Sequence, residues 1–281
     1  MIIIADSGGS KIDWRLVKQD GTILQAHSAG FNPYYQPIGD LQTSVQESIL
    51  ALASEQVKRI FFYGAGVSSE KNQALIREAF SGFFPEAETF VGWDLLAAGR
   101  ALCGTEPGIA CIMGTGSNSC LYDGHDIIGN VANLGWILAD EGSGASIGRK
   151  FLVDHLRGKQ PASVAEKFKQ AWPLTREEFL ERVYQHERPS AFLAGFTRFI
   201  HENLGDEYCY RLIHSCFTEF LEEVVMRYDR YQDYKVHFTG SIAFHFSDIL
   251  RRAAKDKGLT TGHIMNGPIA GLTLYHQKDL A

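Results

Sequence analysis

The sequence predicts an α/β protein built on a repeated unit. Strand-like and helix-like hydrophobic patterns alternate along the chain. A pattern of three apolar runs, separated by a Gly-rich turn and then an Asp-Gly turn, occurs twice, over residues 2–27 and 108–129. No Pro-, Gly- or Ser-rich linker separates the two halves, so the boundary between them must be short.

The first half alternates strands and helices in a regular order. The apolar runs 2–5 and 12–17 predict a hairpin, and the Asp20-Gly21 turn leads to a third strand over residues 22–27. The patterns that follow predict a helix over 38–55, a strand over 59–66, a helix over 70–84, and a strand, turn and helix over 88–104. The predicted order is βββαβαβα.

The second half repeats the meander and then becomes mainly helical. Residues 108–129 predict three strands, helices follow from Ser143, residues 234–258 return to strand, turn and helix, and Gly267-Pro268 begins a last helix. We assign residues 1–106 to an N-terminal lobe and residues 107–266 to a C-terminal lobe. The last helix, 267–281, is a candidate to return to the first lobe.

Composition narrows the class of protein. The formal net charge is −6, from 27 basic and 33 acidic residues without a basic stripe, so we expect no nucleic-acid partner. No apolar stretch reaches the roughly 18 residues of a membrane helix and the first residues lack a secretory pattern, so we expect no membrane partner and a cytoplasmic location. The five cysteines lie in apolar runs without a C-x-x-C pair, which predicts reduced core residues.

Three Gly-rich turns follow buried strands, at residues 6–10, 114–118 and 239–241. None fits the P-loop pattern or the G-x-G-x-x-G pattern that opens a helix. Two hairpin turns can nevertheless hold a polyphosphate from two sides through their N–H groups and hydroxyls. Taken alone, the first turn is open to two interpretations: a tight structural turn, or a phosphate nest with Asp6 directed at a cation.

Four motifs carry a resemblance to a known family. "DSGGSKIDW", "GTGSNSCL", "LGWILADEGSGASIG" and "HFTGSI", in this order, resemble the phosphate, sugar-side and adenosine motifs of the actin/hexokinase/Hsp70 ATPase superfamily. Within it, the chain is similar to the BadF/BadG/BcrA/BcrD ATPase family, in its N-acetylglucosamine kinase branch. The resemblance implies two actin-like (ribonuclease H-like) lobes from a duplicated βββαβαβα unit, a nucleotide cleft between them, and a homodimer.

The resemblance also implies a reaction and its residues. It implies transfer of a phosphoryl group from ATP, with Mg²⁺, to a sugar substrate, at the C6 hydroxyl of N-acetylglucosamine or glucosamine. Asp6 corresponds to the metal-binding acid and Asp94 to the catalytic base. The implied ATP contacts are Gly8, Gly9, Ser10, Lys11, Gly114, Thr115, Gly116, Gly240 and Ser241. The implied sugar contacts are Asn32, Ser117, Asn118, Gly135, Trp136 and Asp140.

Several of these residues have an ordinary structural alternative. Asp94 and Asp140 are also suited to cap the helices that follow them, Trp136 to fill the core, and Asn32 to form a turn before Pro33. The chain also departs from the family at Ala132-Asn133-Leu134-Gly135, where relatives read Gly-Gly-Trp-Gly. The loss of this aromatic residue leaves the identity of the sugar less determined than the use of ATP.

Two other functions remain open on the sequence. The same family includes iron–sulfur ATPases that activate dehydratases, and a cluster would need thiolates such as those of Cys103, Cys111 and Cys120. An actin-type filament protein is the second alternative. Sugar-stimulated ATP consumption distinguishes a kinase from both.

Overall fold

The computed structural model describes residues 1–8 and 11–280, which form two compact units. Unit 1 comprises residues 1–106, 124–126 and those from Gly267 onward, and unit 2 comprises residues 107–123 and 127–266. Over the described residues, each unit contains a five-stranded mixed sheet with the same topology. Among the helices of residues 1–8 and 11–280, none is both long and apolar enough to cross a membrane.

The sheet of unit 1 has the order β3-β2-β1-β4-β5. β1 lies in its centre, antiparallel to β2 and parallel to β4, and its side chains are almost all buried because helices cover both faces of the sheet. The strands are β1 (Ile2–Ser7), β2 (Lys11–Val17), β3 (Ile23–Ala29), β4 (Arg59–Gly64) and β5 (Glu88–Trp93).

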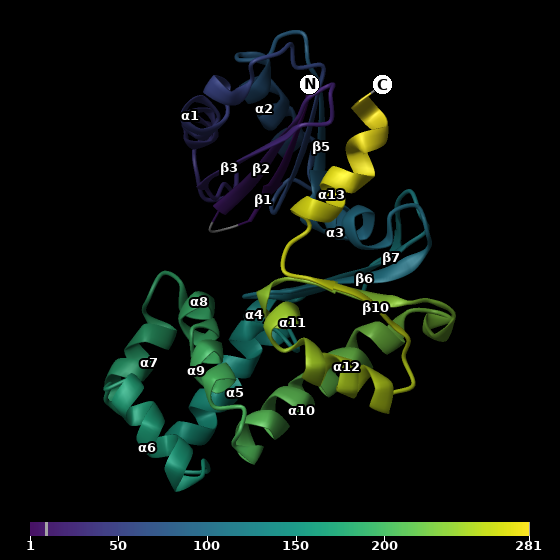
Figure 1. Ribbon diagram of the computed structural model, residues 1–281. Helices are drawn as coiled ribbons and strands as arrows, with labels where there is room; N and C mark the ends of the chain where they lie inside the picture. The colour runs from purple at the N-terminus through teal and green to yellow at the C-terminus, as the bar shows by residue number, and fades with distance from the viewer. Residues whose placement is uncertain (9–10, 281) are drawn as a thin grey trace. The chain divides into compact units, whose positions relative to one another are not determined.

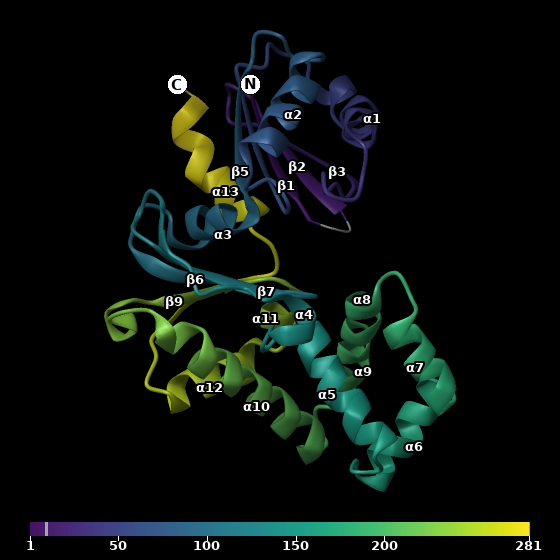
Figure 2. The ribbon, with the colours of Figure 1, turned by 180° about the vertical axis from the view of Figure 1, so that it is seen from behind.

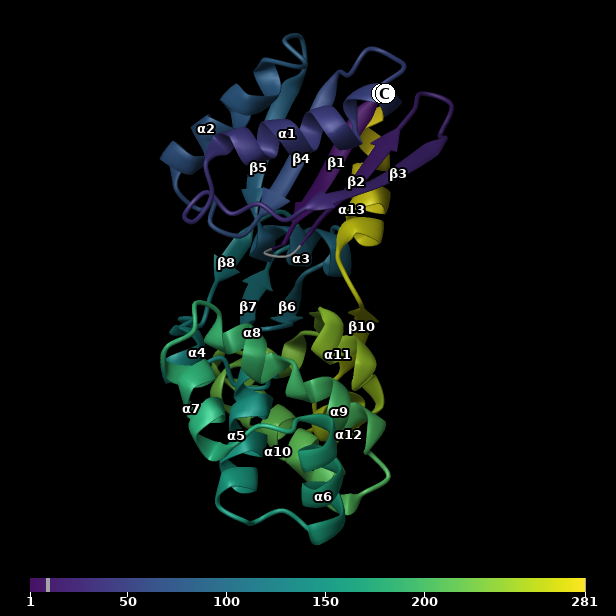
Figure 3. The same ribbon diagram turned by 90° about the vertical axis from the view of Figure 1, so that its left-hand side faces the viewer.

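Two pairs of helices enclose this sheet (Figure 1). The helices are α1 (Ile38–Ser48), α2 (Glu70–Ser81), α3 (Asp94–Cys103) and α13 (Ile269–His276), with short 3₁₀ turns η1 (Leu50–Leu52) and η4 (Gln277–Leu280). α1 and α2 lie on one face, where Phe80 packs edge-on against Trp14 of β2 at 6.2 Å between ring centroids. α3 and α13 lie on the other face, as the side view also shows (Figure 3).

A buried polar network holds α13 in unit 1. Tyr63 of β4 is hydrogen-bonded to Nε2 of His276 at 2.8 Å, and Arg100 of α3 donates to the same tyrosine oxygen at 2.7 Å. Nδ1 of His276 contacts Asp279 at 2.8 Å. The last helix is therefore joined to the first half of the chain.

Unit 2 repeats the sheet with the order β10-β9-β6-β7-β8. β6 takes the central place, antiparallel to β7 and parallel to β9. The strands are β6 (Gly108–Met113), β7 (Ser117–Tyr122), β8 (Ile127–Gly129), β9 (Val236–Thr239) and β10 (Thr261–Met265).

The helices of unit 2 form a larger group. They are α4 (Gly135–Leu138), α5 (Gly144–Leu156), α6 (Ala162–Ala171), α7 (Arg176–Tyr184), α8 (Pro189–Ala194), α9 (Phe196–Glu202), α10 (Glu207–Glu223), α11 (Ser241–His245) and α12 (Ser247–Asp256), with η2 (Val225–Arg227) and η3 (Tyr231–Asp233). α10 and α12 run beneath the sheet, and α6 to α9 gather beyond α5 (Figure 2). Their core is aromatic: Phe168 meets Phe151 edge-on at 4.8 Å and Phe196 at 5.3 Å.

Both predicted meanders are confirmed, and the differences lie at element ends. The first predicted helix stops at Ser48, where Ile49 turns into the core, and the strand predicted over 59–66 ends at Gly64 before Gly66 adopts a φ of +78°. β5 runs directly into α3 without the predicted turn. β10 was not predicted, because Thr261–Met265 is short, contains Gly262 and is only partly buried. All five cysteines are buried, as expected of core residues.

Candidate active site

Two carboxylates, Asp6 and Asp94, belong to one edge of the unit 1 sheet. β1, β4 and β5 are parallel, with Ser7 beside Gly64 and Gly64 beside Trp93, so their carboxyl ends lie at the same edge. Asp6 is the next-to-last residue of β1, and Asp94 is the first residue of α3. In open α/β sheets this edge is the usual place for ligands.

The electrostatic environment of these acids is unfavourable to negative charge. Burial, followed by the neighbouring charges of Asp13 and Asp94, raises the pKa of Asp6 to about 7, and Lys11 acts in the opposite direction. Burial also raises the pKa of Asp94, although the N–H of Leu95 donates to its Oδ1 at 2.9 Å and favours the charged form. A cation placed here would relieve this repulsion.

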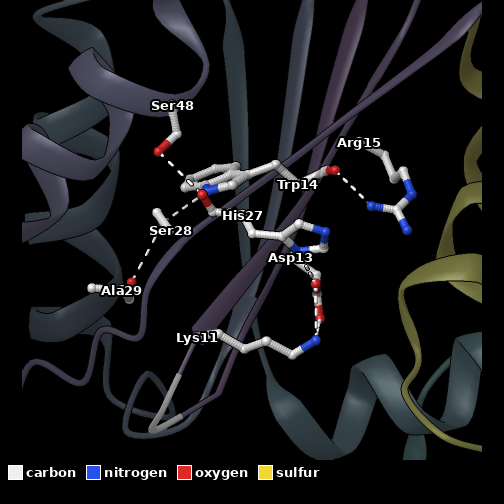
Figure 4. Close-up of polar contacts among 8 residues, drawn as sticks. All are labelled: Lys11, Asp13, Trp14, Arg15, His27, Ser28, Ala29 and Ser48. Atoms are coloured by element: carbon white, nitrogen blue, oxygen red, sulfur yellow. Dashed lines mark hydrogen bonds and ion pairs between the residues drawn. The ribbon is translucent and has the colours of Figure 1, made fainter.

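Asp13 is a third acid of this group that the sequence reasoning missed. It lies directly opposite Asp6 in the β1–β2 hairpin, so both side chains share one face of the sheet. Asp13 is joined to Lys11 at 2.9 Å and to Nδ1 of His27 at 2.5 Å (Figure 4). The alternation of side chains across the predicted hairpin was the signal that could have identified it.

The first Gly-rich turn is only partly described. The N–H of Gly8 donates to the carbonyl of Lys11 at 2.9 Å and closes the turn. Gly9 and Ser10, both predicted ATP contacts, lie outside the described residues. The Lys11 side chain is 64% exposed, so its ammonium group remains accessible although it contacts Asp13.

Asn32 forms a turn before Pro33, as in the structural alternative given for it above. Its Oδ1 accepts a hydrogen bond from the N–H of Tyr34 at 3.0 Å, which is an Asx turn. A Cβ on Gly66 would come within 2.5 Å of the same oxygen, so this loop packs closely on the segment that follows β4. Among the described residues, no acceptor binds Nδ2 of Asn32, which leaves that group for a ligand.

In unit 2, the Gly114–Gly116 turn is bound to the start of α5. The N–H groups of Gly144 and Ala145 donate to the carbonyls of Gly114 and Thr115 at 2.8 and 3.0 Å. With these carbonyls held, the amides of Thr115 and Gly116 have no hydrogen-bond acceptor among residues 1–8 and 11–280. They are available to an anion.

Gly240 and Ser241 lie beside this turn. β9 is parallel to β6, and Ile112 pairs with Thr239, so both strands end at the same edge. Gly240 has a φ of +110°, and a Cβ there would lie 2.3 Å from the carbonyl oxygen of Met113. Only glycine fits this close approach of the two loops.

Asp140 joins the predicted sugar-binding residues of unit 2. Its Oδ1 accepts hydrogen bonds from the N–H of Ser117 at 3.3 Å and from Nδ2 of Asn133 at 3.1 Å. Burial raises the pKa of Asp140, and these hydrogen bonds oppose that shift. Asn118 is the neighbour of Ser117 on β7, and its Oδ1 accepts from Ser119 and Asn130.

A small cavity of about 20 Å³ is lined by residues of this cluster, including Ser117, Asn118 and Asp140. It has room for about one water molecule and is too small for a sugar. The N–H of Gly135, a residue with a φ of +75°, donates to Oδ1 of Asn133, and Trp136 packs partly buried against the core of unit 2. This packing agrees with the interpretation of Trp136 as a core residue.

Known proteins were compared with the whole chain. No family model and no curated protein matches it. The crystal structure of a "Putative N-acetylglucosamine Kinase" from Porphyromonas gingivalis is 39% identical, covers 100% of both chains and has a TM-score of 0.92. A second such protein, from Chromobacterium violaceum, is 17% identical, covers 98% of both chains and has a TM-score of 0.75.

A structure of much lower sequence identity has the same fold. A non-polymerising MamK mutant bound to AMPPNP is 10% identical, covers 99% of this chain and 98% of its own, and has a TM-score of 0.58. This likeness concerns the fold alone, whereas the identity to the Porphyromonas gingivalis protein extends along the whole sequence. The chain therefore belongs to the N-acetylglucosamine kinase-like family that this protein represents, and it has the actin-like ATPase fold.

Proposed function

We propose that the protein is an ATP- and Mg²⁺-dependent kinase that phosphorylates N-acetylglucosamine or glucosamine on the C6 hydroxyl. The observation that carries the proposal is the pair of partly buried acids, Asp6 and Asp94, at the carboxyl edge of the unit 1 sheet. A phosphoryl transfer needs one acid for the metal and one to accept the proton of the attacking hydroxyl. The full-length identity to a protein described as a sugar kinase supports the same reaction.

The donor set at Asp6 fits a hydrated Mg²⁺ ion. Within the described residues, no group of three or more His, Cys, Asp or Glu side chains is arranged to hold a metal by itself. Mg²⁺ commonly binds through one or two carboxylates, water and substrate phosphates, so Asp6 would suffice with ATP present. The bound ion would neutralise charge on the phosphates.

The other roles in the reaction are assigned to residues of the protein itself. Asp94 accepts the proton of the sugar hydroxyl, and its raised pKa makes it a stronger base than an exposed aspartate. The two Gly-rich turns, with Lys11, contact the phosphates of ATP, while Gly240 and Ser241 contact the adenosine. The proposed sugar contacts are Asn32, Ser117, Asn118, Gly135, Trp136 and Asp140.

The surroundings of the cysteines favour a kinase over an iron–sulfur activator. Burial raises the pKa of Cys103 to about 12 and the pKa values of Cys209 and Cys216 to about 11. Thiolates are the ligands of such clusters, and these thiols resist deprotonation. We further infer membership of the BadF/BadG/BcrA/BcrD family, two lobes over residues 1–106 and 107–266, a homodimer, and a cytoplasmic location with access to ATP.

An ADP-release screen tests the proposal. Purified protein with saturating Mg²⁺-ATP is offered glucosamine, N-acetylglucosamine, N-acetylmannosamine, N-acetylmuramic acid or glucose. We expect ADP release to depend on N-acetylglucosamine or glucosamine, and the product to carry phosphate on C6 by NMR. Equal ADP release with and without every sugar, from folded protein, would refute a sugar kinase.

A further inference from the structure

Asn133 makes three hydrogen bonds with its single amide group. Its Nδ2 donates to the carbonyl of Ser117 and to Oδ1 of Asp140, the latter at 3.1 Å. Its Oδ1 accepts from the N–H of Gly135 at 2.8 Å. One side chain thus joins β7, the start of α4 and the carboxylate of Asp140.

Asp140 has a left-handed backbone conformation and is buried. Its backbone φ is +60°, which is uncommon for a residue other than glycine, and only 7% of the residue is exposed. A Cβ on Gly116 would lie 2.9 Å from Oδ2 of Asp140, so the absence of a side chain at residue 116 makes room for this carboxylate.

The two carboxylate oxygens of Asp140 are used differently. Oδ1 accepts from Ser117 and Asn133, whereas none of the residues in 1–8 and 11–280 donates a hydrogen bond to Oδ2. An ionised carboxylate can accept about four hydrogen bonds, so Oδ2 can still accept hydrogen bonds from substrate hydroxyls. Rotation of the carboxylate to another angle would weaken the hydrogen bonds to the bound oxygen and would turn the other oxygen away from its present direction.

We propose that Asn133 is a positioning residue for the sugar: it fixes Oδ1 of Asp140 and thereby presents Oδ2 to the sugar hydroxyls. This inference rests on the proposed kinase function and on Asp140 as a sugar contact. Asn133 itself does not need to touch the substrate. It acts through the orientation of its neighbour.

Other side chains already anchor this part of the chain. Nδ2 of Asn130 donates to the carbonyl of Ser119 at 2.6 Å, and Nη1 of Arg149 donates to the carbonyl of Ile137 at 3.1 Å. Loss of the Asn133 amide therefore leaves the loop tethered on both sides. The loss removes the hydrogen bond to Asp140 together with the bonds to the carbonyl of Ser117 and from the N–H of Gly135.

Asn133→Asp removes the Nδ2 donor, which binds the carbonyl of Ser117 and Oδ1 of Asp140, and keeps the Oδ1 acceptor. The new carboxylate can still accept from Gly135, but it cannot donate, and it places a like charge against Asp140. A hydrogen bond to a charged group is worth enough that we expect the KM for the sugar to rise about 10- to 100-fold, with the KM for ATP unchanged. Asn203→Asp is the matched control, because Asn203 also donates to a carbonyl, that of Phe199 at 2.9 Å, and should change neither KM.

A second comparison keeps the inference testable if Asn133→Asp fails to fold. Asn133→Ala is measured alone and in the Asp140→Ala background, with melting temperatures recorded for all variants. If Asn133 acts through Asp140, Asn133→Ala raises the sugar KM in the wild-type background and has no further effect on sugar affinity in the Asp140→Ala background. Equal effects in both backgrounds would overturn the positioning role.

The two proposals fail in distinguishable ways. A wild-type protein that uses no sugar would refute the kinase function itself. An active wild-type protein, together with Asn133→Asp and Asn133→Ala variants that keep the wild-type sugar KM, would refute only the role of Asn133. Parallel rises in the KM values for sugar and ATP would indicate a general structural role and would also overturn it.

Discussion

Asp94 is the first residue of α3, and a role at the start of the helix and the proposed role as catalytic base require different properties of its side chain. Trp93 occupies the N-cap position and makes no side-chain cap, while Oδ1 of Asp94 accepts from the N–H of Leu95. An asparagine keeps this acceptor and loses the proton-accepting carboxylate. The same residue can therefore be changed in its chemistry with little change in its structure.

We predict that Asp94→Asn lowers kcat by about 10²- to 10⁴-fold, the usual contribution of a general base. The free energy of unfolding should stay within about 0.5 kcal/mol of the wild type, because the hydrogen bond to Leu95 is retained. Steady-state kinetics and thermal unfolding measure the two effects, and calorimetry should show that sugar binding survives. A kcat above about a tenth of the wild-type value would rule out Asp94 as the base.

Asp6 gives a prediction whose size depends on pH. Its folded pKa of about 7 lies above the ordinary value of 3.8, so its favourable contribution to stability is present below pH 3.8 and is lost as the pH rises through 7. Asparagine resembles the protonated form. Without metal, Asp6→Asn should therefore melt at a higher temperature than the wild type at about pH 8, with the difference disappearing toward about pH 4.

The same variant should use Mg²⁺-ATP poorly. We expect a higher Mg²⁺ concentration for half-maximal activity of Asp6→Asn, because an amide is a weaker ligand for Mg²⁺ than a carboxylate. Titration of Mg²⁺ at fixed ATP measures this. Wild-type kinetics in Asp6→Asn would show that the aspartate serves only the turn.

At the scale of elements, the start of α5 acts as a clamp on the Gly114–Gly116 turn. Ser143 caps this helix by accepting from the N–H of Ser146 at 3.1 Å, and the next two amides bind the carbonyls of the turn. The geometry of the turn therefore depends on how well the first turn of the helix is ordered.

Ser143→Ala should cost about 1 kcal/mol of stability and also raise the KM for ATP. Thr175→Ala is the matched control, because Thr175 caps α7 in the same way, accepting from the N–H of Glu178 at 3.3 Å. The control should lose a similar amount of stability and keep the wild-type KM for ATP. If both variants changed the KM equally, the clamp would have no specific role.

The elements that could be predicted are those in which local pattern and tertiary burial agree. The two meanders followed from apolar runs and the turns between them, and both occur in the structure. β10 could not be predicted from its own residues, because Thr261–Met265 is short, contains Gly262 and is only partly buried. The resemblance suggested Asp6 and Asp94 as site residues, which remains a prediction. Asp13 could have been identified from the alternation across the predicted hairpin, whereas Asn133 required the position of Asp140.

At the scale of the whole molecule, each unit contains one buried histidine that resists protonation. Burial lowers the pKa of His276 in unit 1 and of His237 in unit 2 to about 4. The Nδ1 atom of His237 accepts from the N–H of His263 at 3.0 Å, which requires the neutral ring. Each of these two histidines thus binds fewer protons in the folded than in the unfolded chain between pH 4 and 6.5.

We predict that the two histidines contribute a downward slope to stability as the pH is lowered from 6.5 to 4, since the unfolded chain takes up the protons that the folded histidines refuse; Asp6 contributes a slope of the opposite sign. His276→Gln should reduce this slope, because an amide does not titrate and can still bond to Tyr63. Melting temperatures across this range, with the exposed His186→Gln variant as a control, measure the effect. An identical slope in His276→Gln and the wild type would contradict it.

The return of α13 to unit 1 also bears on the order in which the protein can be made. The ribosome releases β1 to β5 first, then all of unit 2, and only afterwards the helix whose His276 bonds to Tyr63. Unit 2 is nearly continuous and can fold during translation, whereas one face of the unit 1 sheet must wait for its covering helix. Asp6 and Asp94 therefore lie in the part of the molecule that is completed last.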